Sequence, residues 1–151
     1  MHASARWSWP WLMPRQDDPT LSGEIALLRR IPPWADRVTW DEHGRPVASS
    51  QNFKDKDEEL SVFIEVEATV EGVLAGHPGF GLVRFSAQQV RTVCGPTIII
   101  CRDPLDPGPL GHVLICGRIT GSMRQKLKGL AQWVEGRWPA RLDPISGQPI
   151  L

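Results

Sequence analysis

Residues 60–67 read LSVFIEVE, and this stretch decides the fold class of the chain. Leu60, Val62, Ile64 and Val66 stand at every second position, so an extended backbone places them on one face. An apolar period of two is typical of a strand with one buried face. The sequence around this stretch therefore has to supply partner strands and a cover for the buried face.

Further strands are predicted on both sides of it. The run TIIIC at 97–101 is apolar and β-branched, which is typical of a central strand. The alternation at 37–49 contains the turn residues of a hairpin. The full set of predicted strands outside 60–67 is 24–31, the two arms of 37–49, 82–86, 97–101 and 112–119.

Capping signals predict helices between these strands. Ser86 followed by Gln89 forms a capping box, and Gly95 is a suitable stop after a helix that runs to about Val93. A short helix is expected at 69–75. Strands and helices in this order predict one α+β domain, with a mixed or mostly antiparallel sheet and two to three short helices.

A last helix is predicted near the C-terminal end of the domain. Ser122 is its expected cap with Gln125 as the box partner, and Gly136 is its expected end. Its apolar stripe would consist of Met123, Leu127, Leu130 and Val134.

The chain of 151 residues divides into three predicted parts. The α+β domain spans 22–136, between a Trp/Pro-rich N-terminal arm at 1–21 and a C-terminal tail at 137–151. The arm is interpreted either as a disordered terminus or as an anchor for a protein partner, because tryptophan is enriched at interface hot spots. The anchor residues would be Trp7, Trp9 and Trp11.

Composition limits the class of partner and the location. The 17 basic and 17 acidic residues cancel, so the whole molecule has no charge that would draw it to nucleic acid or membrane. Its apolar runs are shorter than the roughly 18 to 20 residues of a membrane span. The apolar N-terminal stretch is broken by Ser and Pro, unlike a signal peptide. We expect no membrane partner and a cytoplasmic location.

A metal site is weighed on four residues, Cys94, Cys101, His112 and Cys116. Structural zinc sites usually pair two cysteines two to four residues apart, and this spacing is absent. The cysteines are therefore predicted to be buried thiols, with no metal and no cofactor. His112 and Cys116 share one predicted strand, but about 13 Å would separate them, too far for a hydrogen bond.

An ADP-ribosyltransferase-like pattern is also present in outline. Enzymes of that class carry an Arg on the first strand, a Ser-Thr-Ser strand and a Glu-x-Glu turn, and this chain has Arg30, then SSQ at 49–51, then Glu65 and Glu67. Gln51 departs from the pattern, and the two glutamates fall inside a strand. The alternative interpretation is that both are solvated charges on the outer face of that strand.

The segments SSQNF (49–53), ELSV (59–62) and CRDPLDPGPLGHVLI (101–115) carry a family resemblance. The chain resembles small uncharacterised bacterial proteins, largely actinobacterial, that share an SSQxF…LSV…DP…H pattern. The resemblance spans 27–134 and implies a shared architecture without an established activity. It marks Arg30, Ser50, Gln51, Phe53, Asp103 and His112.

Three functions remain open at this point. The first is a protein-binding or accessory module that acts through the arm. The second is a small enzyme, a toxin-like nuclease or an ADP-ribosyltransferase-like transferase, with Arg30, Ser50, Asp103 and His112 in one cleft. The third is nucleic-acid binding through a basic C-terminal helix, whose candidate residues are Arg118, Arg124, Lys126 and Lys128.

Overall fold

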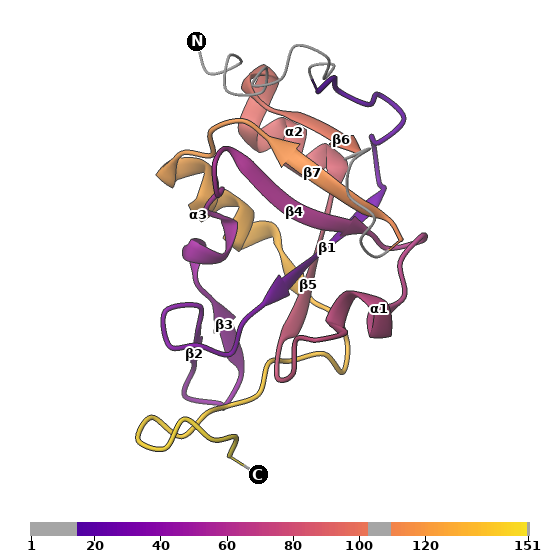
Figure 1. Cartoon of the computed structure of the whole chain (residues 1–151). Coiled ribbons are helices and arrows are strands. Elements are labelled where there is room, and N and C mark those ends of the chain that lie inside the picture. Colours follow the sequence, from indigo (N-terminus) through magenta and orange to yellow (C-terminus); the bar gives the residue numbers. More distant parts are fainter. Residues whose placement is uncertain (1–14, 103–109, 151) are drawn as a thin grey trace.

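A six-stranded sheet forms the centre of the protein, in a computed structural model that describes residues 15–102 and 110–150 (Figure 1). Its strand order is β6-β7-β4-β1-β5-β8, and every neighbouring pair is antiparallel. The strands are β1 (Ala26–Ile31), β4 (Glu59–Ile64), β5 (Gly81–Ser86), β6 (Ile99–Arg102), β7 (His112–Cys116) and β8 (Gln132–Trp133).

A separate hairpin and several short helices complete the architecture. The hairpin pairs β2 (Val38–Trp40) with β3 (Pro46–Ala48). The helices are α1 (Val70–Leu74), α2 (Ala87–Cys94) and α3 (Gly121–Leu130), and two 3₁₀ turns are η2 (Ser50–Phe53) and η3 (Gly95–Thr97). The predicted α+β class and the mostly antiparallel sheet are confirmed.

The main core lies between the sheet and the layer formed by α2, α3 and η2, which we call the helical face. Leu60, Val62 and Ile64 are buried there, as the period of two predicts. Val66 is 88% exposed, because β4 ends at Ile64 and the chain turns toward α1. The predicted stripe is therefore wrong at its last member.

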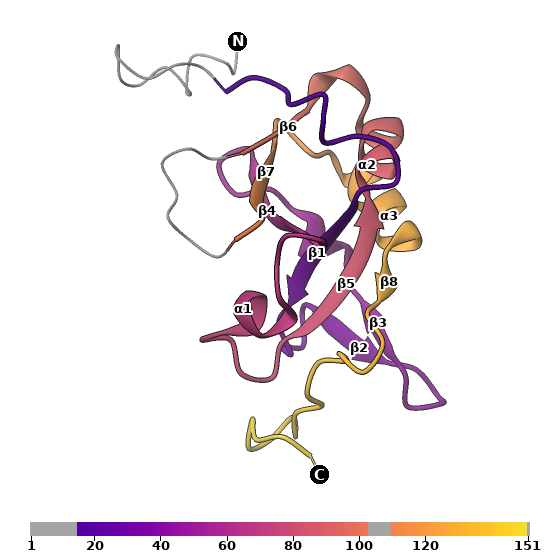
Figure 2. The same ribbon diagram turned by 90° about the vertical axis from the view of Figure 1, so that its right-hand side faces the viewer.

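The opposite side of the sheet, which we call the α1 face, is covered differently. Helix α1 lies on this side, away from α2 and α3 (Figure 2). Val73 of α1 packs in a small cluster with Leu28, Phe63 and Leu82. The rest of this face carries polar side chains and cysteines, so it is the side on which a site can be built.

Helix α2 follows its sequence signals closely. The Ser86 hydroxyl accepts from the backbone N–H of Gln89 at 3.0 Å, and the Gln89 side chain accepts from the Ser86 N–H at 2.8 Å. Gly95 ends the helix with a φ of +68°, a left-handed value that favours glycine. The predicted capping box and stop are confirmed.

Helix α3 differs from its prediction at both ends. Thr120, and not Ser122, is its N-cap, since the Thr120 hydroxyl accepts from the N–H of Met123 at 3.3 Å. The helix stops at Leu130, because the next residues form β8 and pair with β5. Val134 therefore leaves the predicted stripe and packs with Leu28 on the α1 face.

Strand β6 lies at an edge of the sheet, which corrects the prediction of a central strand. Residues 15–21, which we call the N-terminal strap, lie against this edge. The Asp18 N–H donates to the carbonyl of Ile100 at 2.8 Å, and the Asp17 carboxylate accepts from the Ile100 N–H at 3.0 Å. The apolar composition of β6 reflects burial of both its faces rather than pairing on both sides.

The C-terminal segment after β8 packs back on the loop that precedes β5. The carbonyl of Arg137 accepts from the N–H of Leu82 at 3.0 Å, and the N–H of Ala140 donates to Gly79 at 2.8 Å. No helix in the described ranges combines the length and the apolar character needed to cross a bilayer.

Candidate functional site

Strands β1, β4 and β7 bring polar side chains together on the α1 face. Antiparallel register sets Leu28 opposite Phe63, and Phe63 opposite His112. Because side chains alternate along each strand, Ser61 and Arg30 point to the same side as Phe63 and Leu28. When the register that pairs Leu28 with Phe63 is continued by two residues, Arg30 stands opposite Ser61. Side chains in such positions stand about 5 Å apart at Cβ.

Ser61 and His112 form the closest polar contact of this group. The Ser61 hydroxyl oxygen and Nε2 of His112 are 2.5 Å apart, and both side chains are half-buried. The His112 ring also packs on the ring of Phe63, with 5.3 Å between centroids. A hydroxyl within hydrogen-bonding distance of an imidazole is the arrangement that allows a proton to pass from oxygen to nitrogen.

Arg30 lies on β1 and His112 lies on β7, so the two residues flank Phe63 of β4 from opposite sides. Its guanidinium carbon is 5.0 Å from the centre of the Phe63 ring, and one terminal N–H group donates to the carbonyl of Val73 at 2.9 Å. Burial lowers the pKa of Arg30 from its ordinary value, yet a guanidinium stays charged in proteins. The Phe63 ring thus contacts both a fixed positive charge, the Arg30 guanidinium, and the His112 imidazole.

Other arginines around the sheet have carboxylate partners. Arg84 donates to both oxygens of Glu65, at 2.7 and 2.5 Å. Arg102 makes the same two-point contact with Glu67, at 2.8 and 2.6 Å. These hydrogen bonds are the main reason that the pKa values of both glutamates lie below their ordinary range.

Arg30 has no such counter-ion among the residues that the structure describes. A guanidinium has five N–H donors, and the described contacts of Arg30 use one of them, on a neutral carbonyl. A half-buried cation with unused donors is suited to bind an anion in a two-point geometry.

A second imidazole lies within the field of Arg30. His77 follows α1, and its ring packs on Phe80 with 4.9 Å between centroids. Burial lowers the pKa of His77, and the charge of Arg30 lowers it further. Both effects favour the neutral form of the His77 imidazole.

The sequence-predicted candidates divide between the two faces. Arg30 and His112 come together around Phe63, as described. Ser50 belongs to η2 on the helical face, where Gln125 of α3 donates to its hydroxyl at 3.3 Å. Asp103 and the tryptophans Trp7, Trp9 and Trp11 lie outside the described residues.

The basic residues of the C-terminal helix lie in a region of mixed charge. Arg118 and Arg124 line a depression of about 420 Å³ together with acidic residues and Lys54. Arg124 also donates to the carbonyl of Ile119 at 3.0 Å. Lys126 is exposed and Lys128 half-buried on the same helix. The acidic members of the depression are Asp55, Asp57 and Glu58.

The glutamates of the ADP-ribosyltransferase-like pattern are engaged in the ion pairs with Arg84 and Arg102. Ser49 caps η2 by accepting from the Gln51 N–H at 3.0 Å. Arg30 faces the other side of the sheet from these serines. The three parts of that pattern therefore do not meet at one place in the described structure.

Ser61 is the functional residue that sequence reasoning missed. A signal for it was present, since Ser61 is the polar residue within the apolar run LSVFI, on the face opposite Leu60 and Val62. Its proximity to His112 depends on the register between β4 and β7, which the sequence of either strand alone does not contain.

Among the described residues, no group of three or more histidine, cysteine or acidic side chains is arranged to hold a metal ion. Comparisons with known protein families, with curated proteins and with solved structures found no match for this chain.

Proposed function

We propose that the chain is a small enzyme that binds a phosphate-bearing substrate on the α1 face. The observation that supports this most is Arg30, a half-buried guanidinium that has a carbonyl and a ring as described partners but no carboxylate. Phosphate and guanidinium match in charge and in two-point geometry. Nucleic acids and dinucleotide cofactors both carry phosphate, so the proposal covers a nuclease and an ADP-ribosyltransferase.

The Ser61–His112 pair would supply the proton chemistry next to the bound phosphate. In a phosphodiester reaction, the Ser61 oxygen attacks phosphorus while its proton passes to Nε2 of His112. The bond from phosphorus to the leaving oxygen breaks, and that oxygen takes the proton from His112. Water then attacks the phosphorus of the Ser61 ester and gives a proton to His112, the bond from phosphorus to the Ser61 oxygen breaks, and that oxygen takes the proton back. Arg30 would hold the phosphoryl oxygens during this exchange.

Anion binding is tested first, with inorganic phosphate as the probe at constant ionic strength. We expect saturable shifts of the His112 imidazole signals in an NMR titration of the wild type. Arg30→Gln should lose them, because it removes the charge and keeps a similar side-chain length. Arg84→Gln is the matched control, since that arginine lies on the next strand and is paired with Glu65. Equal titration curves for both variants would refute the site.

Catalysis is tested separately with bis(4-nitrophenyl) phosphate, a generic phosphodiester. Ser61→Ala and His112→Asn should each lose at least a hundredfold in turnover, in line with the usual contribution of a general base. Ser50→Ala on the helical face should retain wild-type turnover. Wild-type rates in Ser61→Ala would exclude this serine as the nucleophile, whether or not phosphate binds.

A second proposed function is recognition of a protein partner, favoured by aromatic side chains that remain in contact with water. Trp34 and Trp138 are each 50% exposed. Trp34 packs edge-on against Phe80, and Trp138 against Trp40, with centroids 5.8 and 6.4 Å apart. Half-exposed tryptophans next to arginine are typical of interface hot spots, and Arg141 lies 5.3 Å from the Trp40 ring.

Partner recognition is tested by exchanging these two tryptophans for serine in the full-length chain. We expect Trp34→Ser with Trp138→Ser to lose a complex that the wild type retains during purification from its own cells. Val66→Ser is the control, because Val66 is an exposed apolar residue away from this cluster. Loss of the complex in the control alone would point to a different surface.

A further inference from the structure

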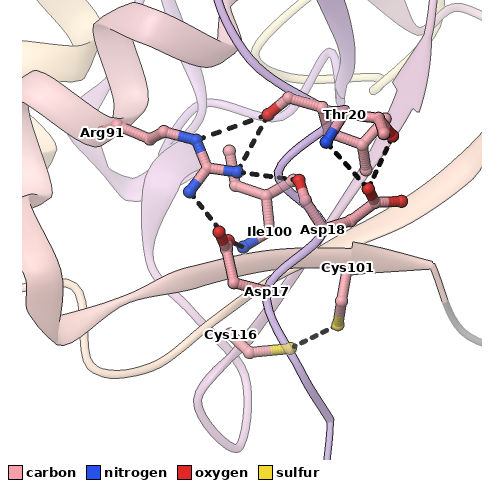
Figure 3. Close-up of polar contacts among 8 residues, drawn as sticks. Asp17, Asp18, Thr20, Arg91, Ile100, Cys101 and Cys116 are labelled. Carbon is pink, nitrogen blue, oxygen red and sulfur yellow. Dashed lines mark hydrogen bonds and ion pairs between the residues drawn. The ribbon is translucent and has the colours of Figure 1, made fainter.

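Two cysteines lie side by side at the strapped edge of the sheet (Figure 3). Cys101 is on β6 and Cys116 on β7, in diagonal positions, since Cys116 is opposite Ile99 and Cys101 opposite Leu114. Their sulfur atoms are 3.6 Å apart, the separation of a hydrogen bond between two thiols. Each side chain is only 3% exposed.

The N-terminal strap contacts this pair through Arg15. Arg15 reaches the α1 face, where its guanidinium contacts the Glu59 carboxylate and lies 3.8 Å from the sulfur of Cys116. The strap then crosses the edge of β6 through its bonds to Ile100. It ends on the helical face, where Leu21 is buried in the main core.

Arg91 of α2 holds the strap in this position. Its guanidinium donates to the Asp17 carboxylate at 2.7 Å and to the carbonyls of Asp18 and Leu21 at 3.2 and 2.9 Å (Figure 3). Three points of attachment on one side chain fix residues 17–21 against the edge. Arg91 therefore acts together with the bonds to Ile100 in holding the strap at this edge of the sheet.

We propose that Cys101 and Cys116 form a reversible disulfide, and that the N-terminal strap controls access of the oxidant. A disulfide needs about 2.05 Å between sulfurs and Cα atoms about 4.4–6.8 Å apart, whereas diagonal neighbours on antiparallel strands stand about 7–8 Å apart, so forming the bond also draws β6 and β7 slightly together. The two sulfurs already touch, so side-chain rotation supplies most of the approach. This inference is independent of the function proposed for Arg30, Ser61 and His112.

Hydrogen peroxide is the oxidant class that fits the small exposure of the pair. The Cys116 thiol, which lies 3.8 Å from the Arg15 guanidinium, loses its proton and attacks one peroxide oxygen as the thiolate. The O–O bond breaks, Cys116 becomes a sulfenic acid, and the leaving hydroxide takes up the proton released by the thiol and departs as water. The Cys101 sulfur then attacks the Cys116 sulfur, the S–O bond breaks, and a second water leaves with the Cys101 proton.

Cys94 provides an internal comparison. It ends α2 in the main core, and burial raises the pKa of its thiol to about 11. A thiol with so high a pKa forms little thiolate at pH 7 and reacts slowly. We therefore expect oxidation to be selective for the pair at the sheet edge.

The disulfide is tested on the full-length protein treated with hydrogen peroxide at pH 7. Intact mass should fall by two hydrogen atoms, peptide mapping should join Cys101 to Cys116 within one chain, and dithiothreitol should restore the original mass. Cys94→Ala should behave like the wild type, and Cys116→Ser should not form the product. Because mapping is done on the wild type, a poorly folded variant does not affect it. A bridge to Cys94, a bridge between chains or no bridge would overturn the proposal.

Control by the strap is tested by the rate of the same reaction. Arg91→Ala removes the three attachments and should speed disulfide formation several-fold. Arg84→Ala, which removes an arginine of similar exposure away from the edge, should leave the rate unchanged. Equal rates for Arg91→Ala and the wild type would show that the strap does not limit access.

Discussion

Arg30 and Arg84 lie on neighbouring strands and point to the same face of the sheet, yet their surroundings differ. Glu65 follows β4 and turns back to meet Arg84, whereas the described neighbours of Arg30 are a ring and a carbonyl. In an ion pair of the first kind, a carboxylate balances the guanidinium charge through two hydrogen bonds. Arg30 keeps N–H donors for a ligand. The presence or absence of a described carboxylate partner therefore distinguishes a structural arginine from a candidate binding residue on this face.

The Arg84–Glu65 pair predicts a pH-dependent contribution to stability. Its hydrogen bonds hold the pKa of Glu65 below the ordinary value of 4.5. A carboxylate whose pKa is lower in the folded state contributes above its unfolded-state pKa, and the contribution is lost as pH falls through the folded-state pKa. Both side chains are about one-third exposed, so Glu65→Gln should cost only about 0.5 kcal/mol at pH 7. Urea unfolding should show no difference from the wild type at pH 2, and a persistent difference would assign the cost to packing.

Substitution of the buried Asn52 should have a larger effect on the free energy of unfolding. It is fully buried, and its amide donates to the carbonyls of Arg37 and Ser49 at 2.7 and 3.0 Å. Asn52→Ala leaves both carbonyls without these donors and should cost about 2–3 kcal/mol of unfolding free energy. The measurement is urea unfolding, with the exposed neighbour Gln51→Ala as the control. Equal costs in the two variants would contradict a specific role of the buried amide.

At the scale of single elements, the start of α3 distinguishes the observed cap from the predicted one. Thr120→Ala removes the hydroxyl that caps the helix and should cost about 1 kcal/mol. Ser122→Ala lies inside the helix and should change stability little or raise it slightly. Thermal unfolding of the two variants checks this, and the reverse ranking would mean that the helix begins two residues later in solution.

Two glycines make a second matched pair at this scale. A Cβ at Gly81 would stand 2.6 Å from the backbone nitrogen of Pro139, whereas one at Gly129 in α3 would meet no atom within 4 Å. Gly81→Ala should therefore lower the free energy of unfolding by about 1–3 kcal/mol, because the added methyl group pushes β5 away from the 137–140 segment. Gly129→Ala should stabilise by about 0.5–1 kcal/mol. Urea unfolding midpoints measure both changes, and a shift in the same direction would contradict the difference in space around the two glycines.

Helices and strands could be predicted where their sequence signals lie within one element. They were predicted less well where pairing with a distant strand competes with the local signal. The Ser86–Gln89 box and Gly95 act within one helix, so α2 followed from its sequence. Helix α3 was predicted six residues too long, at Gly136 instead of Leu130, because β8 gains hydrogen bonds to β5 that the helical pattern does not show. An apolar run such as 97–101 likewise does not distinguish a central strand from an edge strand whose faces are both buried.

At the scale of the whole molecule, the candidate site depends on contacts between distant segments. Arg30 and His112 were picked out from the sequence, but Ser61 was not, and Ser50 lies on the other face. The sequence predicts which residues alternate along a strand, and only the register between β1, β4 and β7 decides which of them meet.

The N-terminal strap sets the limit for a tolerated truncation. Residues 15–21 bond to the β6 edge and bury Leu21, although the sequence assigned them to the arm. The control Gln51→Ala, at an exposed residue of η2, should leave the unfolding midpoint near the wild-type value. Removal of 1–21 should lower stability by at least about 2 kcal/mol, from the loss of a buried leucine and the Arg91 attachments. Urea unfolding compares the two, and equal midpoints would mean that the strap adds no stability.

The strand order also has a consequence for how the chain folds. Strand β1 is made first, yet its two partners, β4 and β5, come much later in the chain. Nascent β1 therefore has to wait for β4, which ends at Ile64, and the centre of the sheet is complete only after Ser86 of β5 has been synthesised. Contacts so distant in sequence slow folding, because loop closure precedes the gain from pairing. During synthesis the segment ALLRRI is thus exposed before its partner strands exist, and it offers a chaperone three large apolar side chains that the folded protein buries.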